Sequence, residues 1–292
     1  MRKSKDSPGR FFRIELLCAV LALTGSISVR GQSLHTNQFQ PTAGRTAAPI
    51  DVTGYWVALI TEDWRYRMLT PLKGDYYGVP LNLAAKKLAD AWDPAKDEAR
   101  GEQCKSYGAP AIMRVPGRIH ISWANDDTLR VEMDNGQQTR LFHFGGWTPP
   151  VGSRSTWQGE SIARWTWPGQ TLRADTRGSL GLRAFTAGAI GAGEFGAGIP
   201  AAPPAPPTTG SLTVLTTHLR AGYLRKNGVP YSANAVVTEY YDLAKPPKGD
   251  QWLTVTTIVD DPEFLEAPFI TSTHFRKQPD GGMWTPEACS SR

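Results

Sequence analysis

Four runs of residues toward the C-terminal end constrain the fold of this chain most, because each is typical of a β-strand. They are dense in Thr, Val, Ile and aromatic residues, which suit a pleated and half-buried surface. None carries apolar residues at the 3.6-residue period of a helix, and turn-forming residues such as Lys226-Asn-Gly228 lie between them. The runs span residues 211–219, 234–241, 251–259 and 269–275. They predict a mainly β protein.

The first 31 residues have the pattern of a secretory signal. Basic residues between Arg2 and Arg13 precede a short apolar run from Leu16 to Leu23, and small residues follow it. This apolar run is too short to span a bilayer as a permanent anchor. We therefore expect residues 1–31 to be removed, and the mature protein to be periplasmic or secreted without a membrane anchor.

The charge of the chain gives no support to nucleic-acid binding. The net charge of the whole sequence is +5, but residues 1–31 hold six of its 32 Lys and Arg and two of its 27 Asp and Glu. The remainder has 26 basic and 25 acidic residues, a net charge of +1. The basic character therefore belongs mostly to the targeting segment.

Two cysteines, Cys104 and Cys289, remain once the signal is removed. In an oxidising compartment such a pair is more often bridged than free, so we predict a disulfide, with two reduced buried thiols as the alternative. The sequence has no Cys-x-x-Cys and no pair of His at ligand spacing. No metal site and no cofactor is expected.

The sequence of the N-terminal half predicts two strands followed by two short helices. Residues 32–50 are polar and aperiodic, so we expect a flexible segment there. Alternating residues predict strands at 51–60 and 64–69. Asn82 is a good N-cap for a helix to Trp92, and Asp93-Pro94 begins a second helix to about Glu102.

Residues 117–144 predict two successive hairpins with a defined register. A three-residue loop at 125–127 puts the apolar residues of both flanking strands on one face. The resulting pairs are Trp123 with Leu129, Ile121 with Val131, and Ile119 with Met133. Asp134-Asn-Gly-Gln137 then predicts a type I′ turn. That turn pairs Leu129 with Phe142, Val131 with Arg140, and Met133 with Gln138.

This register places Arg140 and Gln138 on the apolar, inward face. An unpaired buried charge is costly, so an inward Arg must meet a ligand or pair with a carboxylate such as Glu239. Snorkelling to water from the rim is a further alternative.

The second half of the chain is interrupted by an insertion. Residues 155–167 predict another strand, after which residues 169–210 are rich in Gly, Ala and Pro. Such a segment cannot bury enough apolar surface to offset its ordering entropy, so we expect a disordered loop. The single β-domain then runs over residues 51–289 with this interruption.

Several motifs resemble a group of exported bacterial β-proteins of no established activity. They are an Asp-x-Ser/Thr-Gly-x-Trp opening (Asp51–Trp56), Gly159-Glu-Ser-Ile-Ala-Arg-Trp165, Glu239-Tyr-Tyr241, the run from Asp261 to Phe269, and Pro286-Glu-Ala-Cys289. The resemblance implies a β-barrel-like fold. The opening is also similar to the lipocalin Gly-x-Trp, which implies that Trp56 packs under Arg276 of the last strand.

Mostly sequential antiparallel strands favour a closed barrel of about 8–10 strands, lipocalin- or calycin-like, with a helical excursion near 82–102. A two-sheet β-sandwich is the alternative. Barrels of this size commonly hold one small ligand.

Polar and aromatic residues of the predicted strands are the candidates for chemistry. Glu239 lies mid-strand among apolar residues, where it could act in acid–base catalysis or in a cross-strand ion pair. The catalytic candidates are Glu239, His274 and His218. The ligand-binding candidates are Arg140, Gln138, Trp123, Phe142, Arg220 and Tyr231.

Three functions fit the sequence. The first is a periplasmic barrel that binds a small organic molecule. The second is an enzyme with acid–base chemistry at the barrel mouth, and the third is a structural or protein-interaction module of the envelope. Convergence of Arg140, Glu239 and His274 on one open cavity would favour the first two functions, and a core filled with side chains would favour the third.

Overall fold

The computed structural model describes residues 43–167 and 209–291. The expected secretory signal (1–31), residues 32–42 of the expected flexible segment, and nearly all of the expected insertion at 169–210 lie outside the described residues.

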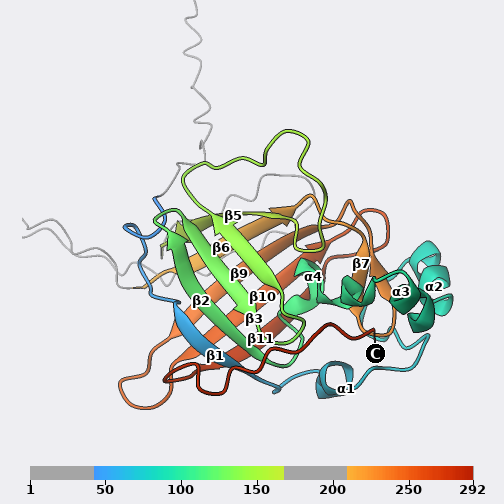
Figure 1. Ribbon diagram of the computed structural model, residues 1–292, viewed down its shortest axis with the longest axis horizontal. Helices are drawn as coiled ribbons and strands as arrows, with labels where there is room; N and C mark the ends of the chain where they lie inside the picture. The colour runs from blue at the N-terminus through green and yellow to red at the C-terminus, as the bar shows by residue number, and fades with distance from the viewer. Residues whose placement is uncertain (1–42, 168–208, 292) are drawn as a thin grey trace, which may run out of the picture. The chain divides into compact units, whose positions relative to one another are not determined.

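Nine strands close into one barrel. They are β1 (Gly54–Leu59), β2 (Arg118–Asn125), β3 (Thr128–Met133), β4 (Thr139–His143), β5 (Glu160–Thr166), β6 (Ser211–Thr217), β9 (Val236–Ala244), β10 (Trp252–Asp260) and β11 (Phe269–Lys277). Their order around the barrel is β1-β11-β10-β9-β6-β5-β4-β3-β2, and β1 pairs with β2 to complete the ring (Figure 1). The prediction of a closed barrel is confirmed, and the β-sandwich alternative is wrong.

One pair of neighbouring strands departs from the antiparallel pattern. Strands β4 and β5 run parallel, with Phe142 opposite Ser161, while the other barrel pairs are antiparallel. A tight hairpin cannot join parallel strands, so residues 144–159 form a long connection between them. The barrel is therefore mixed.

The two predicted hairpins have the expected register. Trp123 lies opposite Leu129 and Ile119 opposite Met133 in the first, and Val131 lies opposite Arg140 in the second. The turn type predicted for the second hairpin is wrong, because φ is positive at Gly136 (83°) and Gln137 (49°) but not at Asn135. The C-terminal tail explains this departure. The backbone of Glu287 bonds to both Asp134 and Gly136 and so holds the turn in another conformation.

The strand predicted at 64–69 is instead a short helix, α1 (Trp64–Met68). Its alternation of aromatic and basic residues suits a strand, but β1 already has β2 on one side and β11 on the other. No edge remains beside β1 for the next segment to join. The segment turns into a helix that buries Arg67 and leaves Trp64 exposed.

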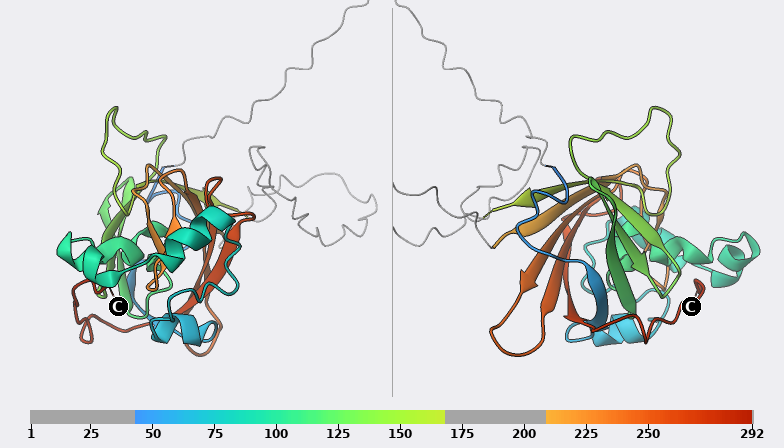
Figure 2. Two further views of the ribbon diagram at one scale, coloured as in Figure 1. Left: turned by 90° about the vertical axis from the view of Figure 1, so that its right-hand side faces the viewer. Right: turned by 60° about the vertical axis from the view of Figure 1, so that its left-hand side comes forward.

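Helices and a small hairpin cover one end of the barrel, which we call the capped end. They are α2 (Leu83–Asp90), α3 (Pro94–Ala99), the 3-10 helix η1 (Gln103–Tyr107), α4 (Ala109–Ile112), β7 (Gly222–Arg225) and β8 (Val229–Tyr231) (Figure 2). The predicted N-caps are confirmed, since Asn82 accepts from the backbone of Ala85 and Asp93 from that of Ala95. A separate core cluster, with Leu81, Val229 and Tyr231 among its members, also includes Val259 and Phe269 at this end of β10 and β11.

The opposite end of the barrel, which we call the open mouth, is crossed by residues 43–53. Ala47, Ala48 and Ile50 pack against the main core, and the Nε1 of Trp165 donates to the carbonyl of Gly44 (2.7 Å). The expectation of a flexible segment as far as residue 50 is therefore wrong for residues 43–50. Their small apolar side chains find a complementary surface among the aromatic residues of the mouth.

Candidate functional site

The inward side chains that the sequence singled out form a buried polar network. Arg140 Nη1 and Nη2 donate to the two carboxylate oxygens of Glu239 at 2.8 and 2.6 Å. Arg140 Nη2 also lies 3.2 Å from Thr216 Oγ1, which is 2.8 Å from Ser161 Oγ. Tyr241 Oη completes the network by donating to Glu239 (3.3 Å).

This network is closed to solvent. The side chains of Arg140 and Glu239 are both fully buried, and the guanidinium carbon lies 4.9 Å from the centroid of the Phe142 ring. Burial alone would lower the pKa of Arg140, but the neighbouring carboxylate of Glu239 holds that pKa above its ordinary value. The contacts of Arg140 are those of a structural ion pair, with Phe142 packed beneath it.

The two candidate histidines lie elsewhere. His274 is on the outer face of β11, where its Nδ1 contacts Glu62 (3.2 Å) and Thr61 (3.1 Å). His218 is exposed, adopts φ 56°, and contacts Thr217 next to it. Arg140, Glu239 and His274 therefore do not converge on one cavity. The arrangement that would favour a ligand-binding barrel or an enzyme built on these three residues is not found.

Three further residues that were predicted to bind a ligand lie instead among contacts within the protein. Gln138 Nε2 donates to the carbonyl of Gly136 (2.6 Å), beside the disulfide. Arg220 pairs with Glu102 on the surface and lies 4.5 Å over the Trp157 ring. Tyr231 is buried in the capped end with its hydroxyl unpaired among the described residues, and burial raises its pKa.

The predicted disulfide is present. Cys104, in η1, is bonded to Cys289 in the C-terminal tail, with a Cα–Cα distance of 5.1 Å. This bond ties the tail to the capped end, next to the turn that Glu287 holds.

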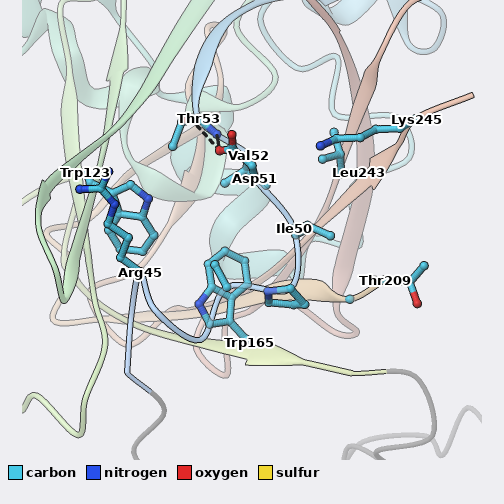
Figure 3. A pocket seen from close by; sticks show the side chains of 13 residues that line it. Arg45, Ile50, Asp51, Val52, Thr53, Trp123, Trp165, Thr209, Leu243 and Lys245 are labelled. Carbon is cyan, nitrogen blue, oxygen red and sulfur yellow. Dashed lines mark hydrogen bonds between the residues drawn. The ribbon is translucent and has the colours of Figure 1, made fainter. Parts of the chain in front are cut away.

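A cavity of about 740 Å³ lies at the open mouth (Figure 3). Trp123, at the end of β2, is the predicted ligand-binding residue that lines it. Trp165 of β5 and Leu243 of β9 add apolar surface from the barrel, and Ile50 and Val52 add it from the segment that crosses the mouth. A volume of this size is within the usual range for sites that hold small molecules.

Charged groups lie around the rim of this cavity. Arg45 and Lys245 bring positive charge, and Asp51 brings negative charge. Burial would raise the pKa of Asp51, but hydrogen bonds from the Thr53 hydroxyl (2.7 Å) and backbone (3.0 Å) hold it below its ordinary value, helped by the charge of Lys277. The rim therefore carries two cations and one carboxylate that stays ionised.

Lys277 also occupies the position that the lipocalin resemblance gave to Arg276. Its Nζ lies 4.4 Å from the centroid of the Trp56 ring and donates to the carbonyl of Thr53. Arg276 points outward and pairs with Asp250 (3.6 Å). The expected residue is wrong by one position, because side chains alternate along β11 and Lys277 is the one opposite Trp56.

Arg45, Ile50 and Lys245 line the cavity although the sequence did not indicate them as ligand-binding residues. The first two belong to the segment that was expected to be flexible, and Lys245 follows the last residue of β9. The apolar residues at 47–50 were the available signal, since they have no role in a solvated segment.

Comparisons with protein-family models, with curated proteins and with solved structures find no match. The resemblance to exported β-proteins therefore stays an expectation from motifs. Among the described residues, no helix is both long and apolar enough to cross a membrane. Within the same ranges, no three His, Cys, Asp or Glu side chains gather as they would around a metal ion.

Proposed function

We propose that this chain is an exported β-barrel that binds a small organic molecule at its open mouth. The observation that carries this proposal is the 740 Å³ cavity, whose lining is shared about equally between apolar side chains, Trp123 among them, and polar or charged groups. Pockets for small molecules combine apolar walls with a few polar groups that orient the ligand. The disulfide supports export, because such bonds persist in oxidising compartments.

The rim charges favour a ligand with an acidic group. Arg45 and Lys245 can pair with an anion, while Asp51 would repel it from its own side. The Trp123 ring offers a flat apolar surface on which an aromatic or alicyclic body can pack. The proposed ligand class is therefore an amphipathic organic acid of modest size.

The experiment is a search for retained ligand by native mass spectrometry, followed by titration of the identified compound. Trp123→Ala should weaken its binding at least about fivefold, because an aromatic contact of this size contributes about 1 kcal/mol or more. Trp64→Ala is the matched control, since Trp64 lies on α1 and is 64% exposed. Binding that is unchanged by Trp123→Ala, or equally reduced by both changes, would contradict the proposed site.

A protein-interaction module is the second candidate function. The barrel interior around Arg140 and Glu239 is filled with side chains, which is the arrangement expected of such a module. Protein that carries no small molecule but co-purifies with a stoichiometric protein partner from its own compartment would favour this alternative.

A further inference from the structure

Three buried arginines gather at the capped end, away from the cavity at the open mouth. We call Arg67 of α1, Arg114 of the loop after α4 and Arg225 of β7 the arginine cluster. Only 5–6% of the surface of each is exposed. Arginine is almost never buried to this degree unless its charge is paired.

Hydrogen bonds and ion pairs within the chain hold two of the three side chains in place. Arg67 Nε donates to the carbonyl of Arg114 (2.9 Å), so these two residues are direct neighbours. Arg67 Nη1 pairs with Glu62, and Arg114 Nη2 pairs with Asp63 (3.1 Å).

Two of the guanidinium groups also lie over aromatic rings. Arg114 lies 5.8 Å from the centroid of Phe269, and Arg225 lies 4.1 Å from that of Tyr66. Stacking occupies the flat face of a guanidinium and leaves the N–H groups along its edge able to donate hydrogen bonds.

Several of these edge groups have no partner. Arg67 Nη2, Arg114 Nη1, and both Nε and Nη1 of Arg225 are buried without a hydrogen-bond acceptor anywhere in the described residues. Leaving a buried polar group unsatisfied costs roughly 1–3 kcal/mol, and more for a charged one. Four of the ten such side-chain atoms in the described residues belong to these three arginines, which is unusual for a structure that is complete without a ligand.

The local charge is also unbalanced. Three guanidinium groups face the carboxylates of Glu62 and Asp63, and Glu62 is shared with His274. The nearby Asp75 is engaged with the exposed Arg65 (2.9 Å). Burial, followed by the charge of Arg114, lowers the pKa of Arg225 to about 10, and the same two causes act to lower that of Arg67.

We propose that the arginine cluster is a binding site for a phosphate-type oxyanion. A phosphate group offers three or four acceptor oxygens in a tetrahedral arrangement, which suits unpaired donors on three guanidinium groups from separate elements. A carboxylate offers two oxygens in one plane and would leave more of these donors unpaired. Arg is the side chain best suited to phosphate, because its N–H groups donate in pairs and its charge persists.

Two sources could supply this oxyanion: free phosphate or a lipid headgroup. Exposed apolar side chains lie beside Arg67 on and after α1, namely Trp64, Met68 and Leu69. They would suit a lipid surface but are not needed for a free ion. The shared chemistry is therefore the proposal, and the experiment separates the two sources.

The experiment titrates the full chain with inorganic phosphate and follows binding by isothermal titration calorimetry and by thermal shift. Chloride at the same ionic strength is the control anion. Phosphate should bind saturably and raise the melting temperature. Arg225→Gln should reduce the affinity at least about tenfold, because a hydrogen bond to a charged group is lost. Arg65→Gln is the matched control, since Arg65 lies on the same helix as Arg67 but its side chain is 63% exposed. The affinity of this variant for phosphate should be unchanged.

A second measurement does not depend on any variant folding. The arginine Nε–H signals in nitrogen–proton NMR spectra of the unmodified protein should include three that shift together as phosphate is added. Binding to vesicles tests the lipid headgroup as the source. Vesicles that contain phosphatidate are compared with vesicles of phosphatidylcholine alone. Phosphatidate binding that is lost in Arg225→Gln, with no binding of free phosphate, indicates a headgroup.

Binding of inorganic phosphate alone indicates a free ion, and either result supports the site. Absence of saturable binding to both probes would overturn it. So would phosphate binding that Arg225→Gln leaves intact, or that Arg65→Gln weakens as much.

Discussion

Arg140 and Glu239 form a two-point ion pair across the barrel interior, in which both oxygens of one side chain accept from the two terminal nitrogens of the other. Neither side chain has any exposed surface. The pair connects β4 with β9, which are not neighbours in the barrel.

The first prediction concerns this pair. Glu239→Gln should lower the free energy of unfolding by roughly 3–5 kcal/mol, because it leaves the Arg140 charge buried without a counter-charge. The double change Arg140→Met with Glu239→Leu should lose far less, since no charge then remains. Urea unfolding measures the loss of unfolding free energy in both variants. Arg130→Gln is the control, because it removes one partner of the partly exposed ion pair between Arg130 and Glu132. A loss below about 1 kcal/mol in Glu239→Gln would contradict a structural role.

The second prediction is that the Cys104–Cys289 bond stabilises the fold strongly. The two cysteines are 185 residues apart, for which the chain-entropy model gives ~5 kcal/mol, and measured values are often lower. Cys104→Ser together with Cys289→Ser should therefore shift the urea midpoint markedly downward. Two thiols that react with an alkylating agent in denatured, unreduced protein would show that the bond is absent.

The third prediction concerns the insertion expected at 169–210. Its flanks lie side by side, since Thr166 pairs with Ser211 in the ladder of β5 and β6. A short turn can therefore join the two strands, and loop length itself changes stability by only ~0.6 kcal/mol per twofold change. Replacing residues 172–208 with such a turn should leave the melting temperature nearly unchanged. A large decrease would mean that the removed residues contribute packing.

The fourth prediction concerns pH. Burial lowers the pKa of His143 below its ordinary value of 6.5, although the charge of Glu160 opposes this. The folded state therefore favours the neutral ring, which stacks on Trp147 at 4.0 Å. This contribution to stability should be complete above about pH 6.5 and should be lost as the pH falls through the folded pKa.

Urea unfolding of the parent and of His143→Gln at several pH values between 7.5 and 4.5 measures that effect. The difference between the two proteins isolates His143 from the other histidines. A difference that is constant across this range would contradict the prediction.

The hairpins at 117–144 could be predicted because their pairing is decided locally. Strict alternation and short turns allow one register, so Ile121 meets Val131 and Arg140 faces inward. The identity of the Arg140 partner depends on which strands lie across the barrel. The sequence could therefore offer Glu239 only as one alternative among several.

Other features depend on contacts between distant segments and could not be predicted in this way. Residues 64–69 alternate like a strand, yet the closed ring leaves them no edge to join. The arginine cluster is assembled from α1, the loop after α4 and β7. None of these three segments shows by itself that its Arg is buried.

The pairing of β1 with β11 has a consequence for how the chain must fold. The first strand of the barrel bonds to the last, so one edge of β1 stays unpaired until nearly all of the domain has been made. A chain that stops before β11 leaves two open edges, on β1 and on β10, and unpaired edges recruit other chains. Contacts so distant in sequence also form slowly. Ring closure therefore distinguishes full-length from truncated chains. An incomplete chain stays prone to aggregation and degradation, while in a complete chain the barrel has no open edge.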